Sequence, residues 1–133
     1  MPWESSQLCL ASFVTNEAIK VEKKIIVGSL GEAISVSQPG FVGDSVCFLW
    51  DKSGFVELYC YHEGRITCLS KPNPTRDLGN LDWQMGLSHW TALDEENLIA
   101  VTGPKELTVF SAHTGKQVRS ICRQSCQIAC ELM

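Results

Sequence analysis

The sequence predicts an all-β fold, an antiparallel meander of about ten short strands. Three observations support this prediction. Short apolar or alternating stretches recur along the chain, turn residues such as Gly, Pro, Asn and Asp separate them, and long helical periodicity is absent. The chain has 133 residues, of which 44% are hydrophobic and 20% charged, and this size and composition suit one globular domain.

Two segments match each other and indicate a repeat. They are KIIVGSLGEAISVS at Lys24–Ser37 and NLIAVTGPKELTVFS at Asn97–Ser111. Each predicts an apolar strand, a tight turn with Gly and a second alternating strand. The second copy continues into a turn at Ala112–Lys116 and another short strand. Repetition on this scale is typical of a repeat architecture rather than of one compact enzyme fold.

The N-terminal part is expected to contribute three strands. Leu8–Val14 is apolar and punctuated by Ser, so it suits pairing at a sheet edge. Ile25–Ser29 and Ala33–Ser37 flank a short turn that contains Gly31, a spacing typical of a hairpin. Asn16–Lys24 and the C-terminal tail are the two helix candidates, and both are too short to be stable without packing.

The middle part is expected to contribute three more strands. Ser45–Trp50 and Phe55–Tyr61 are separated by Asp51–Gly54, a turn in which Gly can adopt a positive φ angle. A second turn at His62–Gly64 leads into the strand Arg65–Ser70.

The longest clear loop, Lys71–Asn80, separates the middle part from the last. Pro72 and Pro74 forbid regular strand pairing in this loop. Four predicted strands follow it: Gly86–Leu93, Leu98–Thr102, Leu107–Ser111 and Gln117–Ile121.

Grouping the strands predicts three units and a tail. Repeats are expected over residues 1–121, in the units Leu8–Ser37, Asp44–Ser70 and Gly86–Ile121, followed by a C-terminal tail at residues 122–133. The third strands of the units begin near Ala33, Arg65 and Leu107, 32 and 42 residues apart. This spacing brackets a propeller blade of about 40–45 residues. Only the third unit has four clear strands, since Phe41-Val42 and Leu78–Trp83 are weak fourth strands of the other two.

The third unit reads LSHWTALDEENLIAVTGPKELTVFSAHTGKQVRSI at Leu87–Ile121. Its polar DEEN turn, its LIAVTG strand and its Thr-Gly-Lys turn resemble a blade of the tryptophan–aspartate (WD) repeat β-propeller family. Ser111 occupies the place of the family's signature Asp, and the Gly-His pair before the blade is missing. Trp50-Asp51 is a literal Trp-Asp dipeptide, but it lies at the end of a predicted first strand.

The resemblance implies a protein–protein interaction scaffold without catalysis or cofactors. A propeller closes with at least about four blades, so three units imply an incomplete propeller. The chain is then a fragment or truncated product of a larger assembly. Its expected partners are proteins, in a multi-subunit complex or through self-association at open blade edges.

Charge and composition exclude several other functions. The net charge of −4 and the isoelectric point of about 5.3 argue against binding through nucleic-acid phosphates. No apolar run approaches the length that crosses a bilayer, and the N-terminus is a poor secretory signal. An intracellular protein, in the cytoplasm or nucleus, is expected. The seven cysteines are then reduced thiols that act as small hydrophobes, with a disulfide framework as the alternative.

The sequence contains no clear catalytic or metal-binding constellation. Cys122, Cys126 and Cys130 recur every four residues and would share a helix face, where thiolates could hold zinc or an iron–sulfur cluster. Structural zinc needs four ligands, so an apolar helix face or a disordered tail is favoured. The spacing of the histidines does not suggest a catalytic pair with a nucleophile and an orienting third group. The acidic residues Asp94–Glu96 are expected to form a solvated turn rather than a cation site.

The candidate partner-binding residues are Arg76, Asp77 and Trp83, in or beside the long loop. Long loops with an aromatic residue and an Arg often supply interface anchors. The alternative for Trp83 is packing between repeats. The alternative for the whole chain is a closed antiparallel barrel that binds a small apolar ligand.

Overall fold

The computed structural model describes residues 5–15, 19–70, 78, 88–103 and 106–122. These residues contain ten antiparallel strands and no helix. The predicted all-β meander is confirmed. The strands are β1 (Leu8–Thr15), β2 (Ile19–Val27), β3 (Val36–Val42), β4 (Ser45–Trp50), β5 (Glu57–His62), β6 (Arg65–Cys68), β7 (Trp90–Ala92), β8 (Asn97–Gly103), β9 (Glu106–Ser111) and β10 (Gln117–Cys122).

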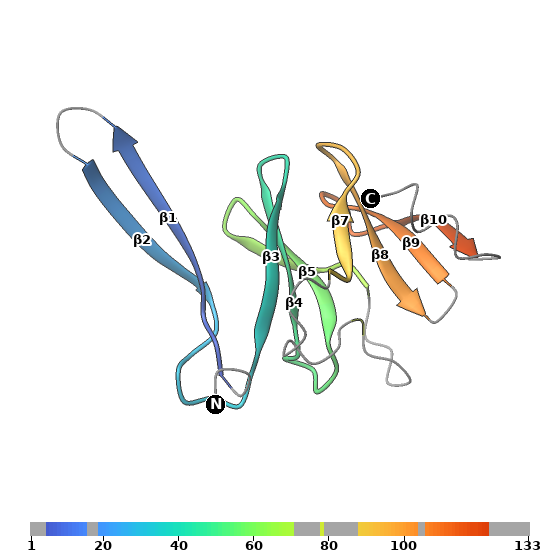
Figure 1. Ribbon diagram of the computed structural model, residues 1–133, viewed down its shortest axis with the longest axis horizontal. Coiled ribbons are helices and arrows are strands. Elements are labelled where there is room, and N and C mark those ends of the chain that lie inside the picture. The colour runs from blue at the N-terminus through green and yellow to red at the C-terminus, as the bar shows by residue number, and fades with distance from the viewer. Residues whose placement is uncertain (1–4, 16–18, 71–77, 79–87, 104–105, 123–133) are drawn as a thin grey trace.

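The strands form three antiparallel sheets. Sheet 1 is the hairpin β1-β2, sheet 2 has the order β3-β4-β5-β6, and sheet 3 has the order β7-β8-β9-β10. Figure 1 shows the sheets side by side with sheet 2 in the middle, so that β3 lies between β1 and β7. Within each sheet, neighbouring strands are consecutive in the chain, because the short turns between them allow hairpin connections.

Sheet 2 is buried on both faces. All six residues of β4, Ser45–Trp50, are buried. Cys47 faces sheet 3 and shares a core with Phe110 of that sheet. Phe48 points the opposite way and shares a second core with Leu8 of sheet 1. The continuous apolar run in this strand is what burial on both faces requires.

Gln38 joins sheet 2 to sheet 3. It lies in a bulge of β3 and has a φ of 48°, a left-handed conformation that costs energy for a residue with a side chain. Its side-chain oxygen accepts a hydrogen bond from His89 N (2.9 Å), and its Nε2 donates to His89 Nδ1 (2.8 Å). Its backbone oxygen accepts from Trp90 Nε1 (2.9 Å). Together these bonds hold β3 against the start of β7.

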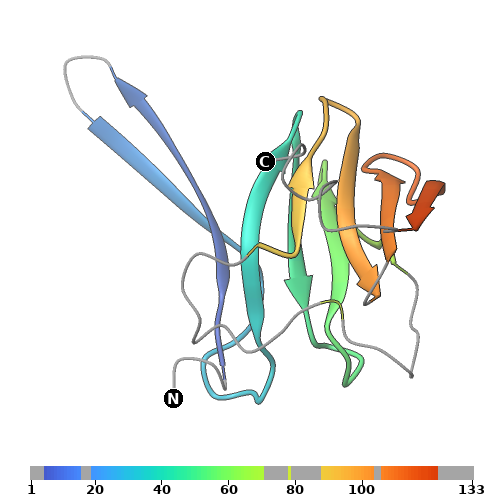
Figure 2. The same cartoon turned by 45° about the vertical axis from the view of Figure 1, so that its right-hand side comes forward.

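Sheet 1 is joined to sheet 2 through fewer buried residues, because Leu8 and Val27 are the described hairpin residues buried in the shared core. The Ser6 hydroxyl donates to Val36 O (2.9 Å) and accepts from Val36 N (2.6 Å), so it substitutes for a strand neighbour. Lys24 Nζ donates to the Tyr61 hydroxyl (3.0 Å) and lies 5.6 Å from the ring centroid. Figure 2 shows that the far end of the hairpin diverges from β3. The hairpin is therefore held mainly at its base.

The first of the two matched segments does not form the predicted hairpin. β2 pairs with β1, and β3 pairs with β4, so the expected Ile25–Ser29 and Ala33–Ser37 hairpin is wrong. The segment between β2 and β3 does not pair with β2, because its residue Ser35 is bound to Asp51 instead. The Asp51 carboxylate accepts a hydrogen bond from Ser35 N (2.6 Å), and Asp51 N donates one to Ser35 O (3.2 Å). The second copy does form a hairpin, β8-β9.

The helix candidate Asn16–Lys24 is also wrong where it is described, because its residues from Ile19 onward lie in β2. The side chains of this segment alternate as in a strand: Val21 pairs with Phe13 on one face of the hairpin, and Lys24 contacts Tyr61 on the other. Strand pairing with β1 thus outweighs a weak local helix preference.

Sheet 2 begins earlier than the predicted middle unit. Its first strand is β3, so Phe41-Val42 belongs to sheet 2 and Trp50 ends the second strand rather than the first. β6 supplies the fourth strand in place of Leu78–Trp83, of which only Leu78 is described. The closed-barrel alternative is wrong for the described strands, because they form three separate sheets. The division into repeats and a tail stays a prediction.

Replacing Phe48 by Ala is expected to lower the free energy of unfolding by about 3–5 kcal/mol, because its ring fills the core between sheets 1 and 2. Phe41→Ala is the matched control on the neighbouring strand, where the ring is 67% exposed, and should change stability by less than about 0.5 kcal/mol. Urea denaturation measures both. Equal losses would contradict the burial of sheet 2 on both faces.

Two substitutions of Gln38 separate its hydrogen bonds from its backbone strain. Gln38→Ala removes the side-chain bonds and keeps the strain, so we expect a loss of about 1–3 kcal/mol. Gln38→Gly removes the bonds but adopts the positive φ freely, so its loss should be smaller. Thermal denaturation measures the difference, and a Gly variant less stable than the Ala variant would contradict this account.

Candidate interaction surface

An exposed apolar face lies on the side of the hairpin that is turned away from sheet 2. Strand alternation gives this outer hairpin face the residues Ala11, Phe13, Val21, Lys23 and Ile25. Phe13 is 64% exposed, Val21 59% and Ile25 51%. The alternate residues of both strands turn toward sheet 2. A contiguous group of exposed apolar side chains on one sheet face is typical of an interaction site.

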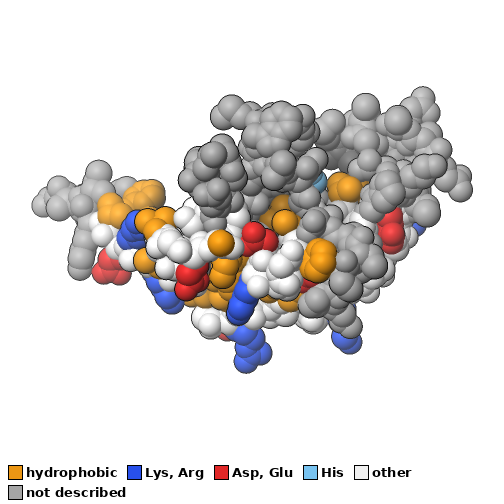
Figure 3. Space-filling model, turned by 90° about the horizontal axis from the view of Figure 1, so that it is seen from below, with side chains coloured by type: hydrophobic (Ala, Val, Ile, Leu, Met, Phe, Trp, Pro, Cys, Tyr) orange, Lys and Arg blue, Asp and Glu red, His pale blue; other side chains and the backbone are white. Residues whose placement is uncertain are grey.

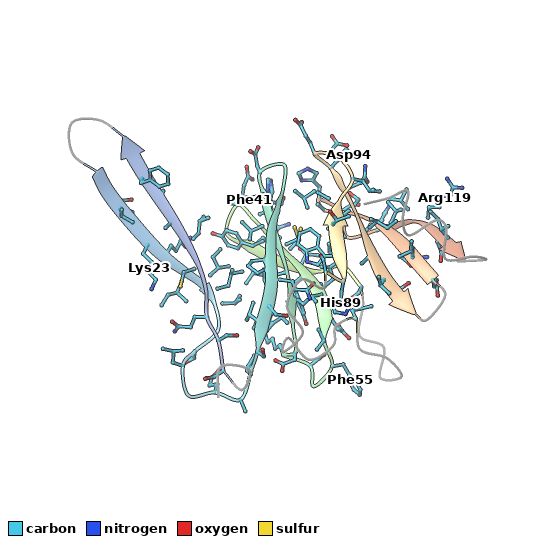
Figure 4. The ribbon with its side chains drawn as sticks, in the orientation of Figure 1. Lys23, Phe41, Phe55, His89, Asp94 and Arg119 are labelled. Atoms are coloured by element: carbon cyan, nitrogen blue, oxygen red, sulfur yellow. The ribbon has the colours of Figure 1, made fainter. Side chains whose placement is uncertain are left out.

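The outer edge of β2 is open among the described strands. Sheets 2 and 3 have four strands each, whereas β2 pairs only with β1. In an antiparallel pair, alternate residues of a strand direct their N–H and C=O groups away from the partner strand, so this edge of β2 can pair with another extended chain. Figure 3 shows hydrophobic side chains at the hairpin end of the molecule beside Lys or Arg and acidic side chains, and Figure 4 shows Lys23 pointing outward from β2.

Three aromatic rings on sheet 2 form a platform beneath the hairpin. The ring centroids of Phe48 and Tyr59 are 6.1 Å apart, and those of Trp50 and Tyr59 are 5.1 Å apart in an edge-to-face contact. Burial raises the pKa of Tyr59 to about 12, with smaller contributions from the negative charges of Cys68 and Glu57. The hairpin thus rests on a buried aromatic surface.

A Ser–His–Glu arrangement that the sequence analysis missed lies at the ends of β4 and β5. Ser45 Oγ is 3.1 Å from His62 Nδ1, and His62 Nε2 is 3.9 Å from Glu63 Oε1. These are the residue types of a nucleophilic triad. Ser45 is 0% exposed, so its hydroxyl cannot reach a substrate, and 3.9 Å is too long for a hydrogen bond. We therefore interpret the arrangement as a structural contact.

The acidic turn at Asp94–Glu96 is organised by its own first residue. The Asp94 carboxylate accepts hydrogen bonds from Glu96 N and Asn97 N, both 2.8 Å long, and from Asn97 Nδ2. The bond from Glu96 N and those from Asn97 lower the pKa of Asp94. Figure 4 shows Asp94 at the tip of the turn between β7 and β8. Asp94 is thus used to cap the turn.

Several predicted site residues lie outside the described residues: Arg76, Asp77, Trp83, Cys126 and Cys130. Cys122 ends β10. Within the described residues, no three His, Cys, Asp or Glu side chains are placed to hold a metal ion. The described part of the chain also contains no helix of the length and apolar character that would cross a membrane.

Comparison with known proteins gives a structural similarity but no sequence family. No family model matches, and no curated protein matches by sequence. The fold is similar to the structure of a puromycin-hydrolysing peptidase from Mycobacterium tuberculosis, with 20% identity and a TM-score of 0.66. The similarity covers 89% of this chain and 18% of the peptidase chain. At this identity it supports the three-sheet fold alone.

Tyr59 predicts loss of stability at high pH. Folded Tyr59 stays neutral until about pH 12, whereas an unfolded tyrosine ionises near about 10. Its contribution is therefore present below pH 10 and is lost as the pH rises toward 12. Ultraviolet absorbance should show one late-ionising tyrosine in the folded chain, and Tyr59→Phe should abolish it. A late step that survives in this variant would contradict the assignment.

Asp94 predicts loss of stability in acid. Its folded pKa is lowered, so its contribution is present above the ordinary Asp pKa and is lost as the pH falls through the folded value. Asp94→Ala should lower the thermal midpoint at neutral pH and make it less sensitive to acid. Glu95→Ala is the control in the same exposed turn, and an equal effect there would argue against a specific role of Asp94.

Proposed function

We propose that this chain is a non-catalytic protein-interaction scaffold, a part of a β-propeller-like assembly, which binds a protein partner through hairpin β1-β2. The observation that carries the proposal is that sheet 1 has two strands where the other two sheets have four. Among the described residues, its outer edge and its apolar outer face are both open. A partner strand can extend sheet 1 along β2, and a partner sheet that stacks on the outer hairpin face covers Phe13, Val21 and Ile25.

The arrangement of the sheets supports the propeller-like part of the proposal. One hairpin and two four-stranded antiparallel meanders stand face to face, and their first strands β1, β3 and β7 succeed one another. The resemblance of Leu87–Ile121 to a WD repeat blade agrees with this arrangement. The turn that carries the resemblance is held by Ser111, whose backbone oxygen accepts from Gly115 N (3.0 Å) and whose N–H donates to Lys116 O (3.0 Å).

Each sheet in such an array buries its apolar faces only against its neighbours. Sheet 2 has a neighbour on both sides, while the outer hairpin face lacks one among the described residues. The natural occupant is another β-sheet, contributed by a partner protein or by a second copy of this chain. The cysteines, which lie mostly in apolar strand patterns, favour an intracellular protein, and the scaffold needs no cofactor.

The test uses a second copy of the chain as the binding partner. Sedimentation velocity of the wild-type chain should show association that grows with concentration. The double variant V21K/I25K places two charges on the outer hairpin face and should remain monomeric. Val118→Lys is the matched control, because Val118 is 61% exposed but lies in β10 of sheet 3, and it should associate like the wild type.

A double variant that associates as strongly as the wild type would contradict binding through the hairpin. Thermal melting of all three chains checks that folding is unchanged. An equal loss of association in V118K would indicate a general effect of added charge instead.

A second candidate follows from the structural similarity. The chain is then a non-catalytic portion of a peptidase-like protein, since 89% of it aligns with 18% of the puromycin-hydrolysing peptidase. Both candidates predict that the purified chain does not hydrolyse puromycin, so activity of the chain alone does not separate them. A lysate component that hydrolyses puromycin and binds the wild type but not V21K/I25K would favour the second candidate, and its absence would favour the first.

A further inference from the structure

Two buried thiols face each other in the middle of sheet 2. Cys47 of β4 and Cys60 of β5 are directly opposite in the strand register, and their sulfur atoms are 2.6 Å apart. Opposite residues in an antiparallel pair have Cα atoms about 4.5–5.5 Å apart, within the range that a disulfide spans. Both cysteines are free thiols. A shift of about half an ångström would bring the sulfurs to the disulfide bond length of about 2.05 Å.

The two thiols differ in access. Cys60 lines a cavity of about 210 Å³ between sheets 2 and 3, and Cys47 does not. The cavity is also lined by His62, Arg65 and His113, and the two imidazole rings meet edge to face at 5.1 Å. Glu63 lines the cavity as well, so the cavity carries both signs of charge around the one sulfur that reaches it. A cationic group that shares a cavity with a thiol favours the thiolate.

The two thiols also differ in ionisation. The contact between the two sulfurs lowers the pKa of Cys60 although burial opposes this, and a hydrogen bond from Ser45 lowers it further. The same contact, together with burial, raises the pKa of Cys47. Cys60 is also the thiol that lines the cavity, so we assign it as the nucleophile and Cys47 as its neighbour.

We propose that Cys47 and Cys60 form a peroxide-sensitive dithiol, in which Cys60 is oxidised through the cavity and then closes a disulfide with Cys47. In the first step the Cys60 thiolate attacks one oxygen of hydrogen peroxide. An S–O bond forms, the O–O bond breaks, and hydroxide leaves and is protonated to water. In the second step the Cys47 sulfur attacks the Cys60 sulfur. The S–S bond forms, the S–O bond breaks, and the hydroxyl leaves as water with the Cys47 proton.

The geometry selects a small oxidant and a local product. The residues are only 0% and 2% exposed, so the cavity admits peroxide more readily than a bulky disulfide reagent. The new bond links the two central strands of sheet 2, on the face that packs against sheet 3. Two equivalents of a small thiol reverse it. This site does not depend on the hairpin or on the proposed scaffold function.

The test maps disulfides in the full wild-type chain after brief treatment with hydrogen peroxide. Remaining thiols are alkylated, and the digested chain is analysed by mass spectrometry. The linked Cys47–Cys60 peptides should appear before any other disulfide and should disappear after dithiothreitol. The thermal midpoint should rise when the link is present, because a disulfide restrains the unfolded chain.

Three variants identify the roles of the two thiols. In Cys47→Ala, the sulfenic acid at Cys60 cannot close a disulfide and should be captured by dimedone. In Cys60→Ala, Cys47 should remain unlabelled. Cys9→Ala removes a half-buried thiol of sheet 1 and should leave the Cys47–Cys60 link unchanged.

The same treatment in urea keeps the test independent of whether the variants fold. In urea the strand register is lost, so the Cys47–Cys60 disulfide should no longer form before the other disulfides. A link that forms equally fast in urea, the absence of the link in the folded chain, or dimedone labelling of Cys47 in Cys60→Ala would each overturn the proposal.

Discussion

Burial of β4 on both faces is the constraint on which the rest of the structure depends. Successive residues of this strand belong to different cores, Cys47 and Leu49 to one and Phe48 to the other. Removing apolar surface from water contributes roughly 25 cal/mol per Å², so a strand that is buried on both faces draws a sheet onto each of them. Sheets 1 and 3 are positioned by this requirement, and each turns its own apolar residues toward sheet 2.

The two interfaces of sheet 2 are unequal. Toward sheet 3, Gly40 allows close contact, since a Cβ at this position would lie 2.9 Å from the Trp90 ring, and Gln38 adds three hydrogen bonds. Toward sheet 1, Ser6 and Lys24 also form three side-chain hydrogen bonds, but Leu8 and Val27 are the described hairpin residues buried in the shared core. Elements with fewer buried contacts open at lower free energy, and binding elements are commonly drawn from them. The hairpin that we propose as the binding element is the less firmly attached neighbour.

Sequence patterns predict strand pairing correctly where the two strands are joined directly by a short turn. The β8-β9 hairpin was predicted because its alternation and its turn agree. The first matched segment has a similar local pattern but a different pairing, which Ser6 and Asp51 decide from distant positions. The end of β2 from Ile25 was predicted as a strand, but its first residues were given as a helix candidate because a short Lys-rich segment does not reveal its partner strand.

The same reasoning explains which part of the candidate sites could have been found. The turn between β4 and β5 was predicted at Asp51–Gly54, but counting outward from it places Cys47 opposite Leu58. The observed pairing starts with Trp50 opposite Glu57, so Cys47 opposite Cys60 could not be found in this way. The cavity beside Cys60 could not be predicted in this way, because His113 comes from the β9-β10 turn of another sheet. The outer hairpin face depends on β2 being a strand, which local propensity alone does not decide.

The meander order of the three sheets also has a consequence for how the chain folds. In every described sheet, neighbouring strands are consecutive in the sequence, so few pairings must close a long loop. All-β proteins usually fold slowly because distant segments must meet first, and this topology lowers the contact order that causes the delay. Each sheet can nucleate at its own turn. Docking onto β4 is then the late event, during which exposed sheet faces can exchange between copies of the chain.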